Sequence, residues 1–291
     1  MSKVLVMTDT VACIPADLAR EHNIKVVPAA NIFYDGNEYV EGVTLSAIEA
    51  YQLIKRDPDG FVTSAITPSY RFEEYLKFSA ESDNIFFVTL SSALSAGSKT
   101  AQLAVELLKE KSPQTTIRVF DSKTVGGAEG LITLVAAKAA AKGMNLDDVA
   151  IIAEKARKQT QGIMMLDTLR YVYRTGRMSK MGSRIAAMFN IKPINKITEE
   201  GKVEMVDRTR NRDDGLEILI QLIKDYAKTD NLHFLVSHSD ALDVANQFGD
   251  MLKQKFNCLS LIISDYSPVM GYGAGPGAIF VGFQPEIDLS N

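Results

Sequence analysis

The sequence predicts an α/β protein of two domains, with a parallel sheet in the N-terminal domain and a mixed sheet in a C-terminal α+β domain. Its 291 residues are about two domains' worth of chain. Before about residue 160, short apolar runs alternate with amphipathic stretches, a pattern typical of a parallel sheet flanked by helices. Beyond that point two strand-like runs are joined only by a turn-rich stretch, which favours some antiparallel pairing. We therefore expect domains at 1–160 and 161–291.

The elements of the first domain follow from apolar runs and helix caps. Short runs rich in Val, Ile and Phe predict buried strands at 4–7, 26–34, 85–90 and 117–120. Helices are expected at 47–56, 70–80, 98–111 and 130–142, with one more after Asn145. Ser46 and Glu49 have the spacing of a capping box. Ser69 is a candidate cap for 70–80, and Asn145 is one for the helix that follows it.

The second domain is expected to surround two long helices with strands. The strand-like runs are 163–166, 203–207, 232–236, 259–264 and 278–283, and the helices are 212–228 and 240–256. The run 237–240 contains the letters of a catalytic triad, but adjacent side chains on a strand point to opposite faces. We interpret it as a strand end followed by Ser239 or Asp240 as the cap of 240–256.

Composition and charge exclude several classes of protein. Lys and Arg total 32 and Asp and Glu total 36, so the net charge of −4 argues against broad nucleic-acid binding. Cys13 and Cys258 form no CxxC pair, so neither a disulfide framework nor a metal site is indicated. The chain opens without a signal-peptide core and has no apolar run long enough to span a bilayer. We expect a cytoplasmic protein without stable membrane insertion.

Common catalytic signatures are absent from the sequence. It contains no GxxxxGK[ST], GxSxG or HExxH motif. The stretch 271–277, with Gly271, Tyr272, Gly273 and Gly275, resembles a dinucleotide loop, but Pro276 replaces its third glycine and a strand follows it. Its glycines suit either a tight turn or close approach to a ligand. No catalytic residue is assigned.

Two hydroxyl-rich turns follow predicted strands of the first domain. One contains Thr63 and Ser64, and the other contains Ser92 and Ser95. Ligands of open α/β sheets bind beyond the carboxyl ends of the strands, and hydroxyls there suit a carboxylate or a phosphate. The alternative is that these residues are local caps and turns.

A basic segment in the second domain is the third feature that could bind an anion. Residues 168–198 carry seven basic side chains and no acidic one, which leaves −11 for the rest of the chain. They are Arg170, Arg174, Arg177, Lys180, Arg184, Lys192 and Lys196. A solvated basic face is the usual explanation, but an anionic ligand or an acidic partner would also suit it.

Together these motifs resemble the DegV family of bacterial fatty-acid-binding proteins, from residue 8 to residue 278. The matching pieces are Thr8-Asp9-Thr10, Thr63-Ser64 with Thr67-Pro68, LSSALSAGS at 90–98, Asp121-Ser122-Lys123 with Gly126-Gly127 and Gly130, Leu166-Asp167-Thr168-Leu169 with Tyr171, Gly176-Arg177-Met178-Ser179, Lys192-Pro193-Ile194 and Gly275-Pro276-Gly277-Ala278. The resemblance implies a two-domain α/β carrier that holds one long-chain fatty acid in a buried apolar tunnel. It also implies presentation of the carboxylate to a separate ATP-dependent fatty-acid kinase for acyl-phosphate formation in phospholipid synthesis.

By motif position, the resemblance assigns the carboxylate to Thr63 and Ser95, with Ser92, Ser64 and Arg170 beside them. A second set of residues, Arg208 and Arg210, falls in the region that resembles the partner-facing loop. No cofactor is implied beyond the bound fatty acid.

The sequence departs from the family pattern at the polar end of the implied site. Gly273 stands where relatives commonly have a histidine, and Ala65 stands where they often have Gln. We expect Tyr272, Arg170 or a water to fill the gap. The alternatives to a kinase-serving carrier are a carrier of another ligand and an enzyme acting on a small carboxylated or phosphorylated metabolite. A transcription-related partner-binding protein is disfavoured by the acidic balance and by the lack of a DNA-reading motif.

Overall fold

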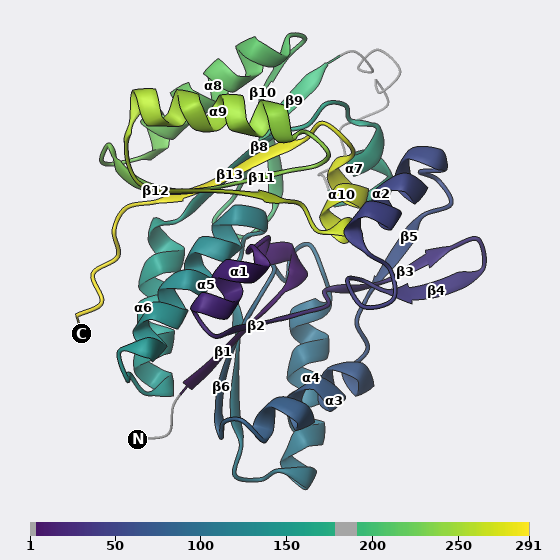
Figure 1. The fold of residues 1–291 in the computed structure, drawn as a ribbon, viewed down its shortest axis with the longest axis vertical. Coiled ribbons are helices and arrows are strands. Elements are labelled where there is room, and N and C mark those ends of the chain that lie inside the picture. Colours follow the sequence, from purple (N-terminus) through teal and green to yellow (C-terminus); the bar gives the residue numbers. More distant parts are fainter. Residues whose placement is uncertain (1–3, 178–190, 291) are drawn as a thin grey trace.

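A computed structural model describes residues 4–177 and 191–290. It contains a four-stranded sheet, a three-stranded sheet and a six-stranded sheet (Figure 1). The first is parallel and the last is mixed, so the predicted α/β fold class is confirmed. The four-stranded sheet is built from residues before 122 and the six-stranded sheet from residues after 160. The domain boundary near residue 160 stays a prediction.

The parallel sheet has the strand order β2-β1-β6-β7. These strands are β1 Val4–Asp9, β2 Ile24–Val27, β6 Asn84–Thr89 and β7 Thr116–Asp121. Alternate residues of β1 face opposite cores, because Val4 and Val6 pack on one side and Leu5 and Met7 on the other. The Leu5 side is covered by α3 Pro68–Ser79 and α4 Gly97–Lys111. The Val4 side is covered by α1 Ala16–Glu21, α5 Gly126–Ala141 and α6 Leu146–Gln159.

The predicted strand 26–34 is wrong, since it is two strands in different sheets. The chain leaves the parallel sheet after β2 and enters β3 Ala30–Tyr34, with Pro28 between them. Strand β3 forms an antiparallel sheet, β4-β3-β5, with β4 Asn37–Val40 and β5 Val62–Ala65, and this sheet was not predicted. These two partner strands are half exposed and carry few large apolar side chains, so no apolar run marks them.

The mixed sheet has the order β10-β9-β8-β13-β11-β12. Its strands are β8 Gln161–Met165, β9 Lys192–Ile197, β10 Val203–Thr209, β11 Asn231–His238, β12 Asn257–Asp265 and β13 Ile279–Gln284. The last two strands do not pair with each other, because β11 lies between them, antiparallel to β13 and parallel to β12. One face carries α8 Arg212–Tyr226 and α9 Leu242–Lys255 (Figure 1).

Helix α5 lies between the parallel sheet and the mixed sheet and is buried along almost its whole length. Its glycines allow this close packing. A Cβ added at Gly127 would lie 2.1 Å from the main-chain oxygen of Leu235 on β11. On the facing strand β13 of the mixed sheet, a Cβ added at Gly282 would lie 2.2 Å from the main-chain nitrogen of Ala128 on α5. The backbone of α5 therefore contacts the mixed sheet directly.

Two of the predicted caps are confirmed. Ser46 and Glu49 form the capping box of α2 Ala47–Arg56, and the side chain of Asn145 accepts hydrogen bonds at the start of α6. Thr67, not Ser69, caps α3, with Pro68 as its first residue.

One more predicted helix cap is wrong, and three short helices were not predicted. Helix α9 begins at Leu242 after Ala241, and the Asp240 side chain instead forms an ion pair with Lys55, 2.5 Å apart. The turn-rich stretch expected between the last two strand-like runs, residues 265–277, contains the helix α10 Pro268–Ala274. The short helices η1 Thr10–Ala12 and α7 Arg170–Thr175 were not predicted. None of the helices in the described ranges is long and apolar enough to cross a membrane.

Candidate functional site

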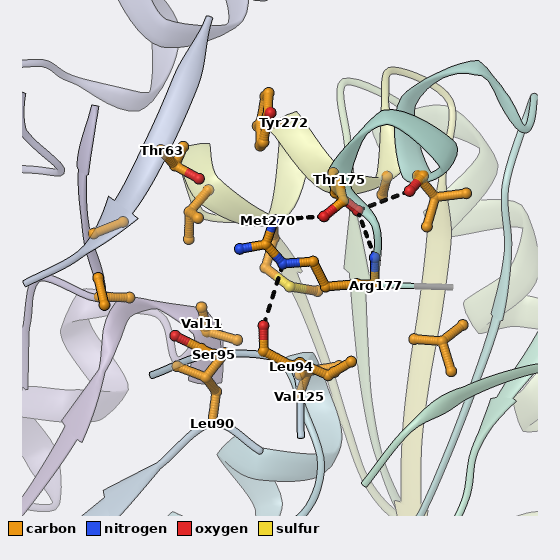
Figure 2. A pocket seen from close by; sticks show the side chains of 18 of the residues that line it. Val11, Thr63, Leu90, Leu94, Ser95, Val125, Thr175, Arg177, Met270 and Tyr272 are labelled. Carbon is orange, nitrogen blue, oxygen red and sulfur yellow. Dashed lines mark hydrogen bonds between the residues drawn. The ribbon is translucent and has the colours of Figure 1, made fainter. Parts of the chain in front are cut away.

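A cavity lies where the parallel sheet, the three-stranded sheet and the mixed sheet meet. The empty space within it, with the open solvent at its mouth included, is about 870 Å³. Side chains from η1, β8, α7 and α10 and from the turns after β2 and β6 form its wall (Figure 2). Most of that wall is apolar, including Val11, Leu94, Val125, Met164, Leu166 and Met270.

Both predicted hydroxyl-rich turns contribute to this cavity, but the first of them is not a turn, because Thr63 and Ser64 lie within strand β5 of the antiparallel sheet. Thr63 and Ser64 reach it from β5, and Ser95 reaches it from the turn before α4. The Ser95 hydroxyl accepts a hydrogen bond from the Gly97 N–H at 3.1 Å, which leaves its own proton free to donate. Figure 2 shows the side chains of Thr63 and Ser95 bordering the same space as Arg177.

Arg177 supplies the positive charge of the site and was not among the predicted site residues. Its Nε donates to the Leu94 main-chain oxygen at 3.3 Å, and its Nη1 donates to the Thr175 oxygen at 2.6 Å. These bonds leave further N–H groups of the guanidinium for an anion. The signal that could have found Arg177 is its place in the Gly176-Arg177 motif within the basic segment.

The other basic residues of that segment face carboxylates. Lys192 and Arg212 both bind Asp167, Lys196 pairs with Glu204, and Arg170 and Arg174 pair with Asp59. Burial raises the pKa of Asp167, but the hydrogen bonds from Lys192 and Arg212 outweigh it and hold that pKa below its usual value. Among the described residues of the segment, only Arg177 lacks a carboxylate partner. Lys180 and Arg184, like Met178 and Ser179 of the motif, lie outside the described residues.

Two predicted site residues do not line the cavity. Ser92 donates its hydroxyl to Asp121 Oδ2 at 2.5 Å, and its main-chain N–H binds Oδ1 of the same carboxylate at 3.1 Å. Arg170 lies half-exposed, 3.7 Å from Asp59. Of the predicted carboxylate ligands, Thr63, Ser64 and Ser95 therefore line the cavity and Ser92 and Arg170 do not, while Arg177 lines it without having been predicted.

The glycine-rich stretch contributes a wall of the cavity as helix α10. Tyr272 and Gly273 line the cavity, whereas Gly271 packs against Tyr51. The fourth residue of the set, Gly275, packs against Tyr171. A Cβ added at Gly273 would meet no atom within 4 Å, so open space remains at the position where the family resemblance leads us to expect histidine.

The Tyr272 ring packs against Arg174 and Phe61. The guanidinium of Arg174 lies 4.5 Å from its centroid, and the ring of Phe61 lies 5.6 Å from it. This packing makes Tyr272 a fixed part of the wall.

The two arginines expected to face a partner lie away from the cavity. Arg208 is on β10 and Arg210 follows that strand, and both are exposed. Neither forms an ion pair with a residue in the described ranges. Within the same ranges, no group of three His, Cys, Asp or Glu side chains is placed to hold a metal ion.

The model of the DegV family, described as uncharacterised proteins, matches residues 3–286. The chain belongs to the DegV family. It is 29% identical to a DegV domain-containing protein of Caldanaerobacter subterraneus, over 98% of this chain and all of that one.

Solved structures of relatives share the fold, and the descriptions of these relatives name fatty-acid binding or a bound fatty acid. A Thermotoga maritima protein, described as revealing a fatty-acid-binding function, aligns with TM-score 0.86 and 21% identity over 98% of this chain and all of that one. The Fatty Acid Kinase B3 protein of Streptococcus pneumoniae, loaded with linoleic acid, aligns with TM-score 0.83 and 19% identity over 98% of this chain and all of that one.

Proposed function

We propose that this DegV protein binds one long-chain fatty acid, with the alkyl chain in the cavity and the carboxylate at Thr63, Ser95 and Arg177. The observation that carries the proposal is an apolar cavity whose wall brings together hydroxyls and one arginine without a carboxylate partner. The fatty-acid-binding function named for the Thermotoga relative and the linoleic acid in the Streptococcus relative support it. Ser64 is the neighbouring hydroxyl.

The apolar wall would supply most of the binding free energy. Each methylene transferred from water contributes about 0.8 kcal/mol, so a 16-carbon chain offers about 10 kcal/mol before the costs of ordering and association. The polar groups would set the orientation. A carboxylate is costly to bury unless it accepts hydrogen bonds, and a guanidinium with two hydroxyls meets that need.

A carrier role fits the cavity better than catalysis. Within residues 4–177 and 191–290, the side chains that line it include hydroxyls and one arginine but no His, Cys, Asp or Glu, so this part of the wall provides no base that could activate Thr63 or Ser95. Presentation of the bound carboxylate to a separate ATP-dependent kinase belongs to the same proposal. The relative described as a Fatty Acid Kinase B3 protein supports that partner, and exposed Arg208 and Arg210 are the residues we assign to the contact.

Mass spectrometry of organic extracts from the purified protein tests the proposal. We expect about one C14–C18 fatty acid per chain. The variant Thr63→Val/Ser95→Ala should lose most of it, because both hydroxyl donors at the carboxylate are removed. Thr116→Val/Ser69→Ala makes the same chemical changes at exposed positions and should retain it. An empty wild-type protein would refute fatty-acid binding, and full occupancy of the first variant would refute the hydroxyl assignment.

A further inference from the structure

Glu41 is fully buried where three separate segments of the chain meet. Its Oε2 accepts hydrogen bonds from the Thr10 hydroxyl at 2.5 Å and from the Ala29 N–H at 3.3 Å. Its Oε1 accepts one from the Val269 N–H at 2.8 Å. One carboxylate thus connects the turn after β1, the turn after β2 and the start of α10.

Each of these segments also forms part of the cavity wall. Val11, which follows Thr10, lines the cavity, and so do Ala29 and Val269 themselves. Helix α10 supplies the wall on the side of the mixed sheet, whereas Val11 and Ala29 belong to the side of the parallel sheet. Glu41 therefore lies directly behind the line along which the two sides of the cavity meet.

The chain connects α10 to the rest of the protein through the edge strand β12 and through β13. The glycines Gly271, Gly273 and Gly275 in and after this short helix give it little intrinsic stability. Its position must come from contacts made by its ends and sides. The Glu41 carboxylate provides a charge-assisted bond to a main-chain donor in its first turn.

Burial raises the pKa of the Glu41 carboxyl, while the hydrogen bonds from Thr10, Val269, Ser267 and Ala29 oppose that rise. A buried carboxylate with several donors is costly to replace, because each donor left without a partner loses a hydrogen bond that water cannot restore. The donors lie on both sides of the cavity, so loss of their hydrogen bonds to Glu41 would loosen the packing of one side against the other.

We propose that Glu41 is a positioning residue that holds α10 against the N-terminal side of the cavity and so limits the rate at which a bound fatty acid leaves. This inference rests on the proposed fatty-acid binding. Glu41 does not line the cavity, so it acts through Val11, Ala29 and Val269.

The test measures dissociation of a fluorescent C18 fatty acid, cis-parinaric acid, from wild-type protein and from Glu41→Gln. Gln keeps the size of the side chain but presents an amide N–H group to the donors that the carboxylate binds. We expect at least fivefold faster release. We also expect faster amide hydrogen exchange in the peptide that contains Val269, because its N–H donates to Glu41. Thr10→Val, which removes one donor and keeps the carboxylate, should show both effects to a smaller degree, and it serves as the test if Glu41→Gln does not fold.

A matched control separates positioning from general stability. Leu219→Ala in α8 removes buried apolar contacts in the core between α8 and the mixed sheet, among residues that do not line the cavity. It should lower the melting temperature and leave the release rate unchanged. Release from Glu41→Gln at the wild-type rate would overturn the inference, and so would an increase in release from Leu219→Ala that matches its loss of stability. Wild-type protein that binds no fatty acid would instead refute the proposed function.

Discussion

The Nε of Arg177 donates a hydrogen bond to the main-chain oxygen of Leu94, 3.3 Å away. Arg177 follows α7, in the second half of the chain, and Leu94 belongs to the hydroxyl-rich turn before α4. This contact brings a positive charge from one half of the protein to the hydroxyl of Ser95 in the other half (Figure 2).

Arg177→Gln should weaken fatty-acid binding. A hydrogen bond to a charged group is worth about 1.5–3 kcal/mol, so we expect the dissociation constant to rise by about 10- to 100-fold. Displacement of a fluorescent fatty acid measures it. Arg170→Gln removes the same charge at a position paired with Asp59 outside the cavity and should leave the constant unchanged. Equal effects of both variants would show that general charge, and not the position of Arg177, controls binding.

Gly273→His should fold normally and improve transfer to a kinase. The site has open space for a Cβ, and His has the higher helix propensity. The imidazole would add a donor at the polar end of the cavity. Acyl-phosphate formation by a cognate fatty-acid kinase should therefore increase, whereas Gly273→Ala, which fills space without a donor, should match the wild type. If both variants behave alike in that assay, the missing imidazole has no role in transfer.

Stability should fall as pH rises from about 4 to 7. Burial raises the pKa of Asp9 to about 6, and burial together with the negative charge of Asp9 raises that of Glu129 well above its usual value. The folded protein therefore keeps protons that the unfolded chain releases from about pH 4 upward, and their loss costs free energy. Asp9 alone accounts for about 3 kcal/mol, from two pKa units.

Glu129→Gln is the variant that tests this assignment. Gln is neutral at every pH, so the decline in the free energy of unfolding between pH 5 and 7, measured with urea, should be shallower than in the wild type. Glu110→Gln, at an exposed position of α4, should keep the wild-type slope. Parallel curves for Glu129→Gln and the wild type would mean that this carboxyl does not titrate in the range.

Gly127→Ala should lower the free energy of unfolding by about 2–4 kcal/mol. The added methyl group would lie 2.1 Å from the Leu235 oxygen, and the two atoms nearest to it belong to the backbone of a central strand. Gly273→Ala, also within a helix but facing open space, should change stability by no more than about 1 kcal/mol, toward greater stability. Urea denaturation compares the two. A small effect at Gly127 would contradict the close contact between α5 and β11.

Sequence reasoning located the turn that contains Ser95, because strand ends and turn residues are local signals, but it assigned Thr63 and Ser64 to a turn and they lie in strand β5. It placed Ser92 beside Ser95 at the site, because the two residues belong to the same turn. Ser92 is directed to Asp121 at the end of β7, and this pairing depends on how β6 and β7 lie side by side. The exchange of Arg170 for Arg177 has the same origin, since the position of α7 determines which arginine faces Asp59 and which faces the cavity. Their roles in binding stay predictions.

Helix α10 could not be predicted from propensity. Its sequence contains two glycines, which disfavour a helix, and only the Ser267 cap with Pro268 at the first position signals one. Tertiary packing provides the rest of the stability of this helix, because Gly271 allows close contact with Tyr51 and Gly275 allows close contact with Tyr171. Tertiary contacts of this kind involve residues more than 100 positions apart, and no local pattern contains them.

The burial of α5 between two sheets bears on how the chain can be divided. A fragment that stops at residue 160 would expose one side of this apolar helix to solvent, because β11 and β13, which cover that side, come later in the chain. The remaining piece would lose the cover on the corresponding face of its own sheet. Each fragment expressed alone should therefore aggregate. Co-expression of the two fragments should instead yield a one-to-one complex.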